Sequence, residues 1–214
     1  MEIRHDPVKR VFDIFFSLLF LSLCFPFLLS IGLLVRVTTK GPALYKSRRL
    51  GRGGRLIYCL KFRTMYADAE ARLQEVLRDP VKKREWDRYQ KLWEDPRITP
   101  IGGFLRRTSL DELPQFWNVL KGDLSVVGPR PPTLVGPPEN ALKEIHALYG
   151  KSAYAILSVR PGITGIWQIS GRSKIPFSER SKMEARYAAS RTFWSDLVVI
   201  AKTIPAVLFS KGAC

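Results

Sequence analysis

The longest apolar stretch of the 214-residue chain lies near its amino terminus. Residues 14–35 read IFFSLLFLSLCFPFLLSIGLLV and contain no charged side chain. As a helix that rises about 1.5 Å per residue, this stretch would be roughly 33 Å long, which is enough to cross a bilayer. It is too long for the apolar part of a secretory signal, and no small-residue cleavage site follows it. We therefore expect it to remain in the mature protein.

Pro26 lies near the middle of this apolar stretch. A proline inside a helix removes one backbone hydrogen bond, here the bond to the carbonyl of Ser22, and costs roughly 3 kcal/mol, so we expect a kink. Each arm of about a dozen residues would then reach only about 18 Å, and the helix could enter a membrane and return on the same side. Basic residues precede and follow the stretch, which favours the cytoplasmic side for both ends.

Two other arrangements of this stretch stay open. A single kinked helix that crosses the membrane fits the physics about equally well, because proline is tolerated in spanning helices. The core helix of a soluble protein would also be apolar, but it is the weakest of the three interpretations.

Beyond the apolar stretch, the pattern predicts a hairpin and several amphipathic helices. Residues 43–65, ALYKSRRLGRGGRLIYCLKFRTM, contain two strand-like segments joined by a Gly-Arg-Gly-Gly turn. Residues 67–93 follow a helical pattern that breaks at Pro80. A further apolar periodicity runs over residues 183–208, with a break expected at Pro205.

Aromatic and apolar side chains of these helical segments form stripes between basic residues. In the first segment the later stripe comprises Trp86, Tyr89, Leu92 and Trp93. Such a stripe either packs into a core, which is the commoner case, or lies in the headgroup layer of a membrane. Residues 128–138, GPRPPTLVGPP, hold too many prolines for a regular element and predict a rigid turn near a functional site.

The charge of the chain restricts its partners. Lysine and arginine total 35 against 19 acidic residues, a net charge of +16, which favours nucleic acid, an anionic lipid surface or phosphorylated substrates. Cys24, Cys59 and Cys214 are far apart, odd in number and form no C-x-x-C pair. They indicate neither a zinc site nor a disulfide framework, and they favour a reducing, cytosolic setting for most of the chain.

Two adjacent carboxylates stand out in this basic chain. They are Asp111 and Glu112, within RRTSLDELPQFWNVL. Ser109 and Glu112 have the S-x-x-E spacing of a capping box, and Pro114 is acceptable in a first helical turn, so a helix from about Asp111 to Leu120 is expected. Taken alone, this structural interpretation is the more economical one.

A helix start would also give the two acids a chemical use. Its positive end, with Arg106 and Arg107, should hold Asp111 ionised and attract phosphate. Consecutive side chains on a helix diverge by about 100°, so the two carboxylates do not easily chelate one ion together. One of them could instead attack a phosphorus atom while the other holds a metal on its oxygens.

Five further cations support phosphate chemistry. Each stands beside glycine, proline or strand-like residues that could fix the backbone, as phosphate binding by lysine and arginine requires. Taken singly, each is more simply a solvated surface cation. Together with an acid pair and a membrane segment they form a more specific constellation. They are Lys61, Arg63, Arg130, Arg160 and Arg172.

Three motifs give the chain a family resemblance. They are KFRTM at residues 61–65, TSLDELPQFWNVLKGDLSVVGPRP at 108–131 and RPGITGIWQISGRS at 160–173, in this order behind a basic-flanked apolar helix with a central proline. This arrangement resembles the bacterial sugar transferase family, the monotopic polyprenyl-phosphate phosphoglycosyl transferases. The resemblance covers nearly the whole chain, and the three motifs together are highly specific.

The resemblance implies an activity and a location. Members transfer a sugar 1-phosphate from a nucleotide diphosphate sugar, here a UDP-sugar, to polyprenyl (undecaprenyl) phosphate and release a nucleoside monophosphate. This is the first membrane step of exopolysaccharide, O-antigen or glycoconjugate assembly. It takes place at the cytoplasmic face of the bacterial inner membrane. WQISGRS, residues 167–173, and the terminal SKGAC resemble the members that use simple hexoses.

The resemblance also implies roles for residues. Asp111 matches the aspartate that forms a covalent phosphosugar intermediate, and Glu112 matches the glutamate that binds the required Mg²⁺. Arg106, Arg130 and Lys61 match residues that hold phosphate groups.

Two positions depart from the family pattern. Phe25 replaces the usual serine before the helix-breaking proline, which leaves Ser22 as the nearby hydroxyl that could relieve the break at Pro26. Glu184 stands approximately where members have a functional aspartate.

Pattern and resemblance together predict a mainly α fold with a small β hairpin (α+β). Residues 1–40 would form the re-entrant membrane helix with its basic flanks. Residues 41–214 would form a compact cytosolic catalytic domain with interfacial amphipathic helices. The expected partners are a nucleotide sugar, polyprenyl phosphate and an anionic membrane surface, but not nucleic acid, and a homo-oligomer is left open.

Two alternatives have no catalysis. A membrane-tethered nucleic-acid binder would use the net charge and the aromatic stripes, and its affinity would fall steeply with salt. An inert membrane scaffold would use Ser109 to Glu112 only to cap a helix.

Overall fold

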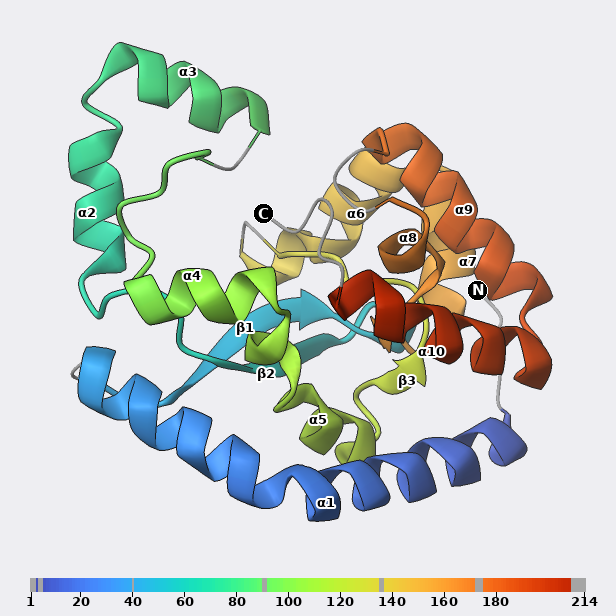
Figure 1. Ribbon diagram of the computed structural model, residues 1–214. Coiled ribbons are helices and arrows are strands. Elements are labelled where there is room, and N and C mark those ends of the chain that lie inside the picture. The colour runs from blue at the N-terminus through green and yellow to red at the C-terminus, as the bar shows by residue number, and fades with distance from the viewer. Residues whose placement is uncertain are drawn as a thin grey trace.

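The computed structural model describes residue 3 and residues 6–39, 41–89, 92–134, 137–171 and 175–208. Within these ranges helices dominate, and the strands are few and short, as the expected α+β class requires (Figure 1). The helices are α1 (Pro7–Thr39), α2 (Ala69–Val76), α3 (Pro80–Tyr89), α4 (Pro100–Arg107), α5 (Gln115–Lys121), α6 (Ala141–Tyr149), α7 (Ser152–Ser158), α8 (Ile166–Ile169), α9 (Phe177–Ser190) and α10 (Phe193–Leu208). The strands are β1 (Leu44–Leu50), β2 (Leu56–Phe62), β3 (Ser125–Val127) and β4 (Gly162–Thr164), and the 3-10 turns are η1 (Arg52–Gly54), η2 (Leu110–Glu112) and η3 (Pro138–Asn140).

Helix α1 follows a bent course along the lower edge of the molecule in Figure 1. By length and composition it could cross a membrane: the mean hydropathy of its apolar window is 2.6, and only 11% of that window is buried. This low burial argues against the core helix of a soluble protein, because such a helix hides its apolar side chains. The exposed apolar surface makes α1 suited to membrane association.

Helix α1 continues through its proline. Pro26 lies inside α1, and the hydroxyl of Ser30 donates a hydrogen bond to its carbonyl at 2.9 Å. Ser22, whose hydroxyl was expected to relieve the break, is exposed. The hydroxyl that bonds to the backbone of Pro26 is that of Ser30, which was not selected from the sequence. The kink at Pro26, the re-entrant path and the division at residue 40 stay predictions.

Strands β1 and β2 form the predicted hairpin. They pair antiparallel, with Leu44 opposite Phe62 and Leu50 opposite Leu56, and η1 makes the turn. Gly53 has a φ of 74°, a conformation that glycine adopts without steric cost and that explains the glycine-rich connection. The hairpin runs through the middle of the molecule in Figure 1.

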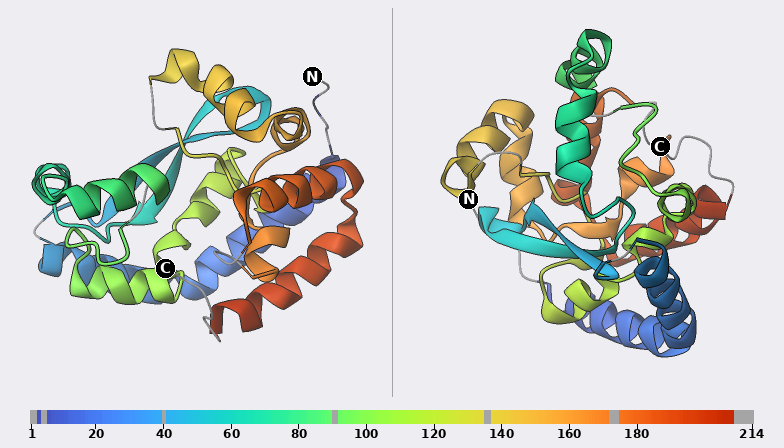
Figure 2. Two further views of the ribbon diagram at one scale, coloured as in Figure 1. Left: turned by 90° about the horizontal axis from the view of Figure 1, so that it is seen from above. Right: turned by 90° about the vertical axis from the view of Figure 1, so that its left-hand side faces the viewer.

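The helical segment after the hairpin breaks where the proline predicted. Helix α2 ends at Val76, and α3 begins at Pro80, whose missing N–H costs nothing at the first position of a helix. Both helices stand away from the body at the end opposite to α9 and α10 (Figures 1 and 2). The residues of the predicted aromatic stripe differ in burial: Leu92 is buried and Trp93 is largely exposed. The side chain of Tyr89 lies outside the described residues.

The carboxy-terminal helices break at a different place from the one expected. Pro205 lies inside α10, so the predicted break there is wrong. The chain instead turns at Arg191 and Thr192, between α9 and α10. The Thr192 backbone N–H donates to the hydroxyl of Ser195 at 2.9 Å, and the Ser195 N–H donates to the Thr192 hydroxyl at 3.1 Å. This reciprocal pair caps the start of α10 and explains the turn.

The main core lies between the hairpin and the second sheet, in which β3 and β4 pair parallel. Alternate positions of β2, Ile57 and Cys59, face this core, where they meet Phe116 and Val119 of α5. The next position on the same face is Lys61, so the strand alternation turns a lysine inward at the end of an apolar row. An inward lysine needs acidic partners, and these define the site described next.

Candidate active site

The two acids lie in the 3-10 turn η2 and not in an α-helix. Ser109 precedes them with a φ of 56°, the one positive φ of a non-glycine residue in the described chain, and its side chain makes no capping hydrogen bond. Helix α5 begins only at Gln115, after Pro114. The predicted capping box is therefore wrong, because an N-cap residue needs an extended backbone to turn its hydroxyl to the first amides of a helix, and Ser109 is left-handed. Such strained non-glycine turns are costly and cluster at functional sites.

Asn118 fixes the position of this turn against the hairpin. It is 1% exposed, its side-chain amide donates to the carbonyl of Tyr58 at 2.7 Å, and its side-chain oxygen accepts from the N–H of Leu60 at 2.8 Å. These bonds satisfy backbone groups on the edge of β2 that has no strand partner there. They also set the register of α5 and η2 along β2, which brings the acids opposite Lys61.

Lys61 joins both carboxylates. Its ammonium group lies 2.6 Å from Oε1 of Glu112 and 3.7 Å from Oδ2 of Asp111. Arg130 adds a second bond to Glu112, with Nη2 at 3.2 Å from the same Oε1. The sequence predicted that the acids would diverge as on an α-helix, but in this turn both carboxylates contact one ammonium group.

The two acids have pKa values shifted in opposite directions. Burial acts to raise the pKa of Glu112, but Lys61 and Arg130 outweigh it and hold that pKa well below its usual range. Burial raises the pKa of Asp111 and is the dominant cause; Lys61 opposes it, and the neighbouring Glu112 adds to it. Glu112 is thus ionised and paired at neutral pH, whereas Asp111 has the higher proton affinity.

This result corrects the expected electrostatics of Asp111. The sequence assigned its ionisation to the positive end of a helix and to Arg106 and Arg107. Asp111 is not in an α-helix, and Arg107 is exposed on α4. Arg106 does act to lower the pKa of Asp111, but burial prevails.

A cavity of about 1150 Å³ opens in front of these acids. One part of its wall is cationic and polar: Lys61, Arg63, Arg106 and Arg130 all line it. Thr64 orients Arg106 by accepting a hydrogen bond from its Nε at 2.9 Å. Four of the predicted phosphate-binding side chains are therefore brought together around Asp111 and Glu112.

Arg160 is placed elsewhere, contrary to the expectation that it joins these cations. Its Nε donates to the carbonyl of Gly122 at 3.1 Å, beside the end of α5. The backbone of Arg160 lies beside Gly128, just after β3, but its side chain is held at the end of α5, and Arg160 does not line the cavity. Arg172 lies outside the described residues.

Glu184 lies behind the cavity wall. It is 1% exposed, and its Oε1 accepts from the backbone N–H of Arg130 at 3.2 Å and from Nε of Arg180 at 3.3 Å. Arg180 in turn lies over the ring of Trp167, with 4.2 Å to the ring centroid. Burial raises the pKa of Glu184. These contacts give Glu184 the position of a residue that orients Arg130, not of one that touches a substrate.

Replacement of Glu184 tests this orienting role. We expect Glu184→Ala to lower the free energy of unfolding by about 2 to 3 kcal/mol, because it leaves the Arg130 amide and Arg180 without their buried acceptor. Glu184→Gln keeps an acceptor and should stay within about 1 kcal/mol of the wild type. Chemical denaturation measures both, with the exposed Glu179→Ala as control. Equal losses in the alanine and glutamine variants would show that the charge, not the acceptor, is what the site needs.

Some residues of the site were not selected from the sequence. Asn118, Thr64 and Trp167 all lie inside the motifs quoted for the resemblance, but only the charged residues of those motifs were chosen. Arg49, on β1, also lines the cavity, and burial followed by repulsion from Arg130 lowers its pKa. An asparagine among apolar residues, as in FWNVL at 116–120, is a signal that sequence reasoning could have used, because a buried amide needs paired partners such as a strand edge supplies.

The site offers limited ligands for a metal ion. The described residues contain no group of three or more histidine, cysteine, aspartate or glutamate side chains that could hold one. Glu112 is ionised and adjacent to Asp111 on the cavity wall. One or two carboxylates fit an ion such as Mg²⁺, which takes its remaining ligands from water and substrate phosphates.

Comparison with known proteins identifies relatives of the whole chain. A family model described as bacterial sugar transferase matches residues 4–210. The undecaprenyl-phosphate galactose phosphotransferase of Salmonella typhimurium is 41% identical over 208 residues, 96% of this chain and 41% of the relative. The exopolysaccharide production protein ExoY of Rhizobium meliloti is 41% identical over 206 residues, 96% of this chain and 87% of ExoY.

A further relative is the UDP-galactose-lipid carrier transferase of Erwinia amylovora, which is 42% identical over 208 residues, 96% of this chain and 41% of the relative. The chain thus spans about two fifths of the Salmonella and Erwinia proteins and most of ExoY.

Proposed function

The chain belongs to the bacterial sugar transferase family, and on this basis we propose that it transfers a sugar 1-phosphate from a UDP-sugar to undecaprenyl phosphate. The reaction releases uridine monophosphate and begins the membrane stage of exopolysaccharide or related glycan synthesis. The names of the relatives support a lipid phosphate acceptor and an exopolysaccharide product. The donor sugar we favour is a simple hexose, and two of the relatives are named for galactose.

The observation that supports this proposal is the difference in pKa and in ion pairing between the two acids. A carboxylate with a higher proton affinity is the stronger base and the better nucleophile. Asp111 has that property, and it faces a cavity lined with phosphate-binding cations. Glu112 is held in ion pairs with Lys61 and Arg130 and is poorly suited to attack. Asp111 is therefore the nucleophile.

In the first step a carboxylate oxygen of Asp111 attacks the phosphorus atom that carries the sugar. The new O–P bond forms as the bond between that phosphorus and the bridging oxygen breaks, and uridine monophosphate leaves with the electron pair. No proton transfer is required, because the leaving phosphate oxygen stays ionised. Lys61, Arg106 and Arg130 line the cavity where this charge develops and stabilise it.

In the second step an oxygen of the lipid phosphate attacks the same phosphorus atom. The bond to Asp111 breaks, the carboxylate is regenerated, and the product is a polyprenyl diphosphate sugar. Two steps separate the nucleotide from the lipid phosphate, so the two anions never need the same cations at once. The covalent intermediate keeps the activated sugar phosphate while the site exchanges one anion for the other.

We assign the metal site to Glu112. A bound Mg²⁺ there would neutralise charge on the phosphate oxygens of the donor. Lys61 and Arg130 hold the Glu112 carboxylate in place, so it meets the ion ionised and already oriented. The proposed location is the cytoplasmic face of the bacterial inner membrane, with α1 entering one leaflet and returning, which would hold the cavity at the depth of the lipid phosphate.

The test uses the purified chain with a panel of donors. We expect UDP-galactose or UDP-glucose to give one equivalent of uridine monophosphate without lipid, and continuous release with undecaprenyl phosphate. UDP-N-acetylgalactosamine should be the poorer donor. The measurements are uridine monophosphate release and retention of a labelled sugar phosphate on the protein. Release that requires lipid from the first turnover would exclude the covalent intermediate, and no release with any donor would exclude the function.

A further inference from the structure

The cavity in front of Asp111 has a second part that the donor does not explain. Beyond the cationic wall, the lining changes to apolar side chains from α1, α5, β4 and α10. The uracil of a UDP-sugar can stack on one aromatic ring, but its ribose, diphosphate and hexose are polar and gain little from an apolar wall that extends over several elements. The apolar part of the cavity therefore calls for a different ligand, or for a different part of one.

Aromatic rings form one side of this apolar part. Phe16 and Phe20 of α1 are half-buried and line the cavity, while most of the apolar side chains of α1 are exposed on the outside of the molecule. Phe20 stacks on Phe116 of α5 with 4.0 Å between the ring centroids. This contact fixes the rings, so the wall is preformed and smooth.

One face of α10 forms the opposite side. Ile200, Thr203, Ile204 and Val207 line the cavity, and their spacing of three, four and seven places them on one face of a helix. The Thr203 hydroxyl bonds to the carbonyl of Val199 and to the hydroxyl of Thr164, both at 2.7 Å. Both bonds engage the Thr203 hydroxyl within the protein, and the other three residues of this face are apolar, so this wall is mainly apolar.

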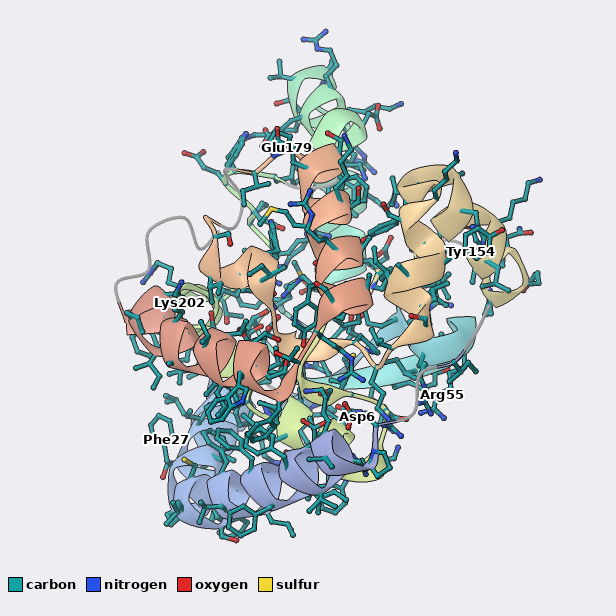
Figure 3. All side chains as sticks on the ribbon, turned by 90° about the vertical axis from the view of Figure 1, so that its right-hand side faces the viewer. Asp6, Phe27, Arg55, Tyr154, Glu179 and Lys202 are labelled. Carbon is teal, nitrogen blue, oxygen red and sulfur yellow. The ribbon has the colours of Figure 1, made fainter. Side chains whose placement is uncertain are left out.

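The apolar part also leads outward. Ile204 is 60% exposed, so the groove between α1 and α10 is open at this helix. Figure 3 shows α10 above α1, with Lys202 and Phe27 labelled at the same edge of the molecule. The groove thus connects the cationic wall around Asp111 with the exposed apolar surface of α1, the surface that suits a membrane.

A cationic end joined to an apolar groove matches a phosphate that carries a hydrocarbon chain. We propose that the groove between α1 and α10 binds the first isoprene units of the lipid acceptor and guides its phosphate to the phosphorus atom on Asp111. This inference rests on the proposed function and adds to it the place where the lipid chain lies. The groove serves only the second step, because the donor reacts at the cationic end.

The two half-reactions separate the groove from the rest of the site. Ile204→Trp should fill the groove, and Phe20→Ala should remove its stacked ring. We expect both variants to form the labelled phosphosugar intermediate from a UDP-hexose within about twofold of the wild-type rate. Their KM for undecaprenyl phosphate should rise about tenfold, the low end of the discrimination that one side chain in an apolar pocket provides. Formation of the intermediate also reports that each variant is folded.

Val198→Trp is the matched control, because Val198 lies on α10, is 51% exposed and does not line the cavity. It should transfer to the lipid as the wild type does. Wild-type lipid kinetics in both Ile204→Trp and Phe20→Ala, with labelling intact, would overturn the groove assignment. A KM increase of the same size in Val198→Trp would also overturn it, because the effect would then come from the membrane surface of α10. A wild type that forms no labelled intermediate would instead refute the proposed function.

Discussion

Replacement of Asp111 by asparagine is expected to abolish formation of the phosphosugar intermediate and sugar phosphate transfer, by at least about a thousandfold, as is usual when a nucleophile is removed. The amide has nearly the same shape but no negative oxygen to bond to phosphorus. Glu112 does not substitute, since Lys61 and Arg130 hold its carboxylate at 2.6 and 3.2 Å. Retention of a labelled sugar phosphate on the protein measures the loss.

The same substitution should not weaken the fold. The pKa of Asp111 is raised in the folded protein, above its ordinary value of 3.8, so the folded state binds a proton more tightly than the unfolded state. The stability that this proton provides is lost as the pH rises through the raised pKa. The asparagine side chain is neutral at every pH, so the variant should match or exceed the wild type in free energy of unfolding at neutral pH.

Two further measurements make this prediction decisive. Asp87→Asn, on the exposed surface of α3, should change neither labelling nor stability. In the wild type the labelling rate should rise with pH as Asp111 loses its proton, and the midpoint should lie above that of a free aspartate. Intact labelling in Asp111→Asn would move the nucleophile to another residue. A fold that collapses in this variant would show that Asp111 is structural.

The hairpin and the carboxylate pair could be predicted because their signals are local. A glycine-rich turn between two strand-like segments and a proline at the start of α3 act within a few residues. The grouping of Lys61, Arg106 and Arg130 around the acids followed from the family motifs, since no spacing along the chain places residues so far apart in sequence beside one another.

Other features depend on the tertiary structure and could not be predicted from the sequence. The S-x-x-E spacing at Ser109 favours a capping box, but the packing of α4 and α5 against the hairpin imposes a left-handed turn there instead. The contact of the Arg160 side chain with the end of α5 joins segments far apart in the sequence, and the strands β3 and β4 beside it, of three residues each, are too short to be recognised in the sequence. The raised pKa of Asp111 follows from burial, which is a property of the whole site.

The acid pair also explains why the site tolerates so much charge in a small volume. Asp111 and Glu112 repel one another, and Lys61 and Arg130 repel one another, but each acid shares a cation with its neighbour. Lys61 is the one residue of the described site that contacts both carboxylates. Its loss should therefore have a larger effect than the loss of any other cation on the cavity wall.

Lys61→Met, which keeps the length and removes the charge, is expected to lower the free energy of unfolding by about 2 to 3 kcal/mol at neutral pH. Breaking a buried pair costs more, about 3 to 5 kcal/mol, but these side chains keep some contact with solvent. Labelling should also fall steeply, because Lys61 lines the cavity where negative charge develops on the phosphate oxygens during attack. Lys46→Met, at an exposed position of β1, is the control and should change neither property.

The pH dependence of this loss identifies its cause. Lys61 and Arg130 lower the pKa of Glu112 below its ordinary value of 4.5, so their stabilising effect is fully present above that pH and disappears as the pH falls through the lowered pKa. The difference between wild type and Lys61→Met should therefore be largest near neutral pH and shrink below pH 4.5. Denaturation midpoints measured across this range test it. A difference that stays constant with pH would mean that the loss does not come from the ion pair with Glu112, and Asp111 would then need another cation to balance its charge during attack.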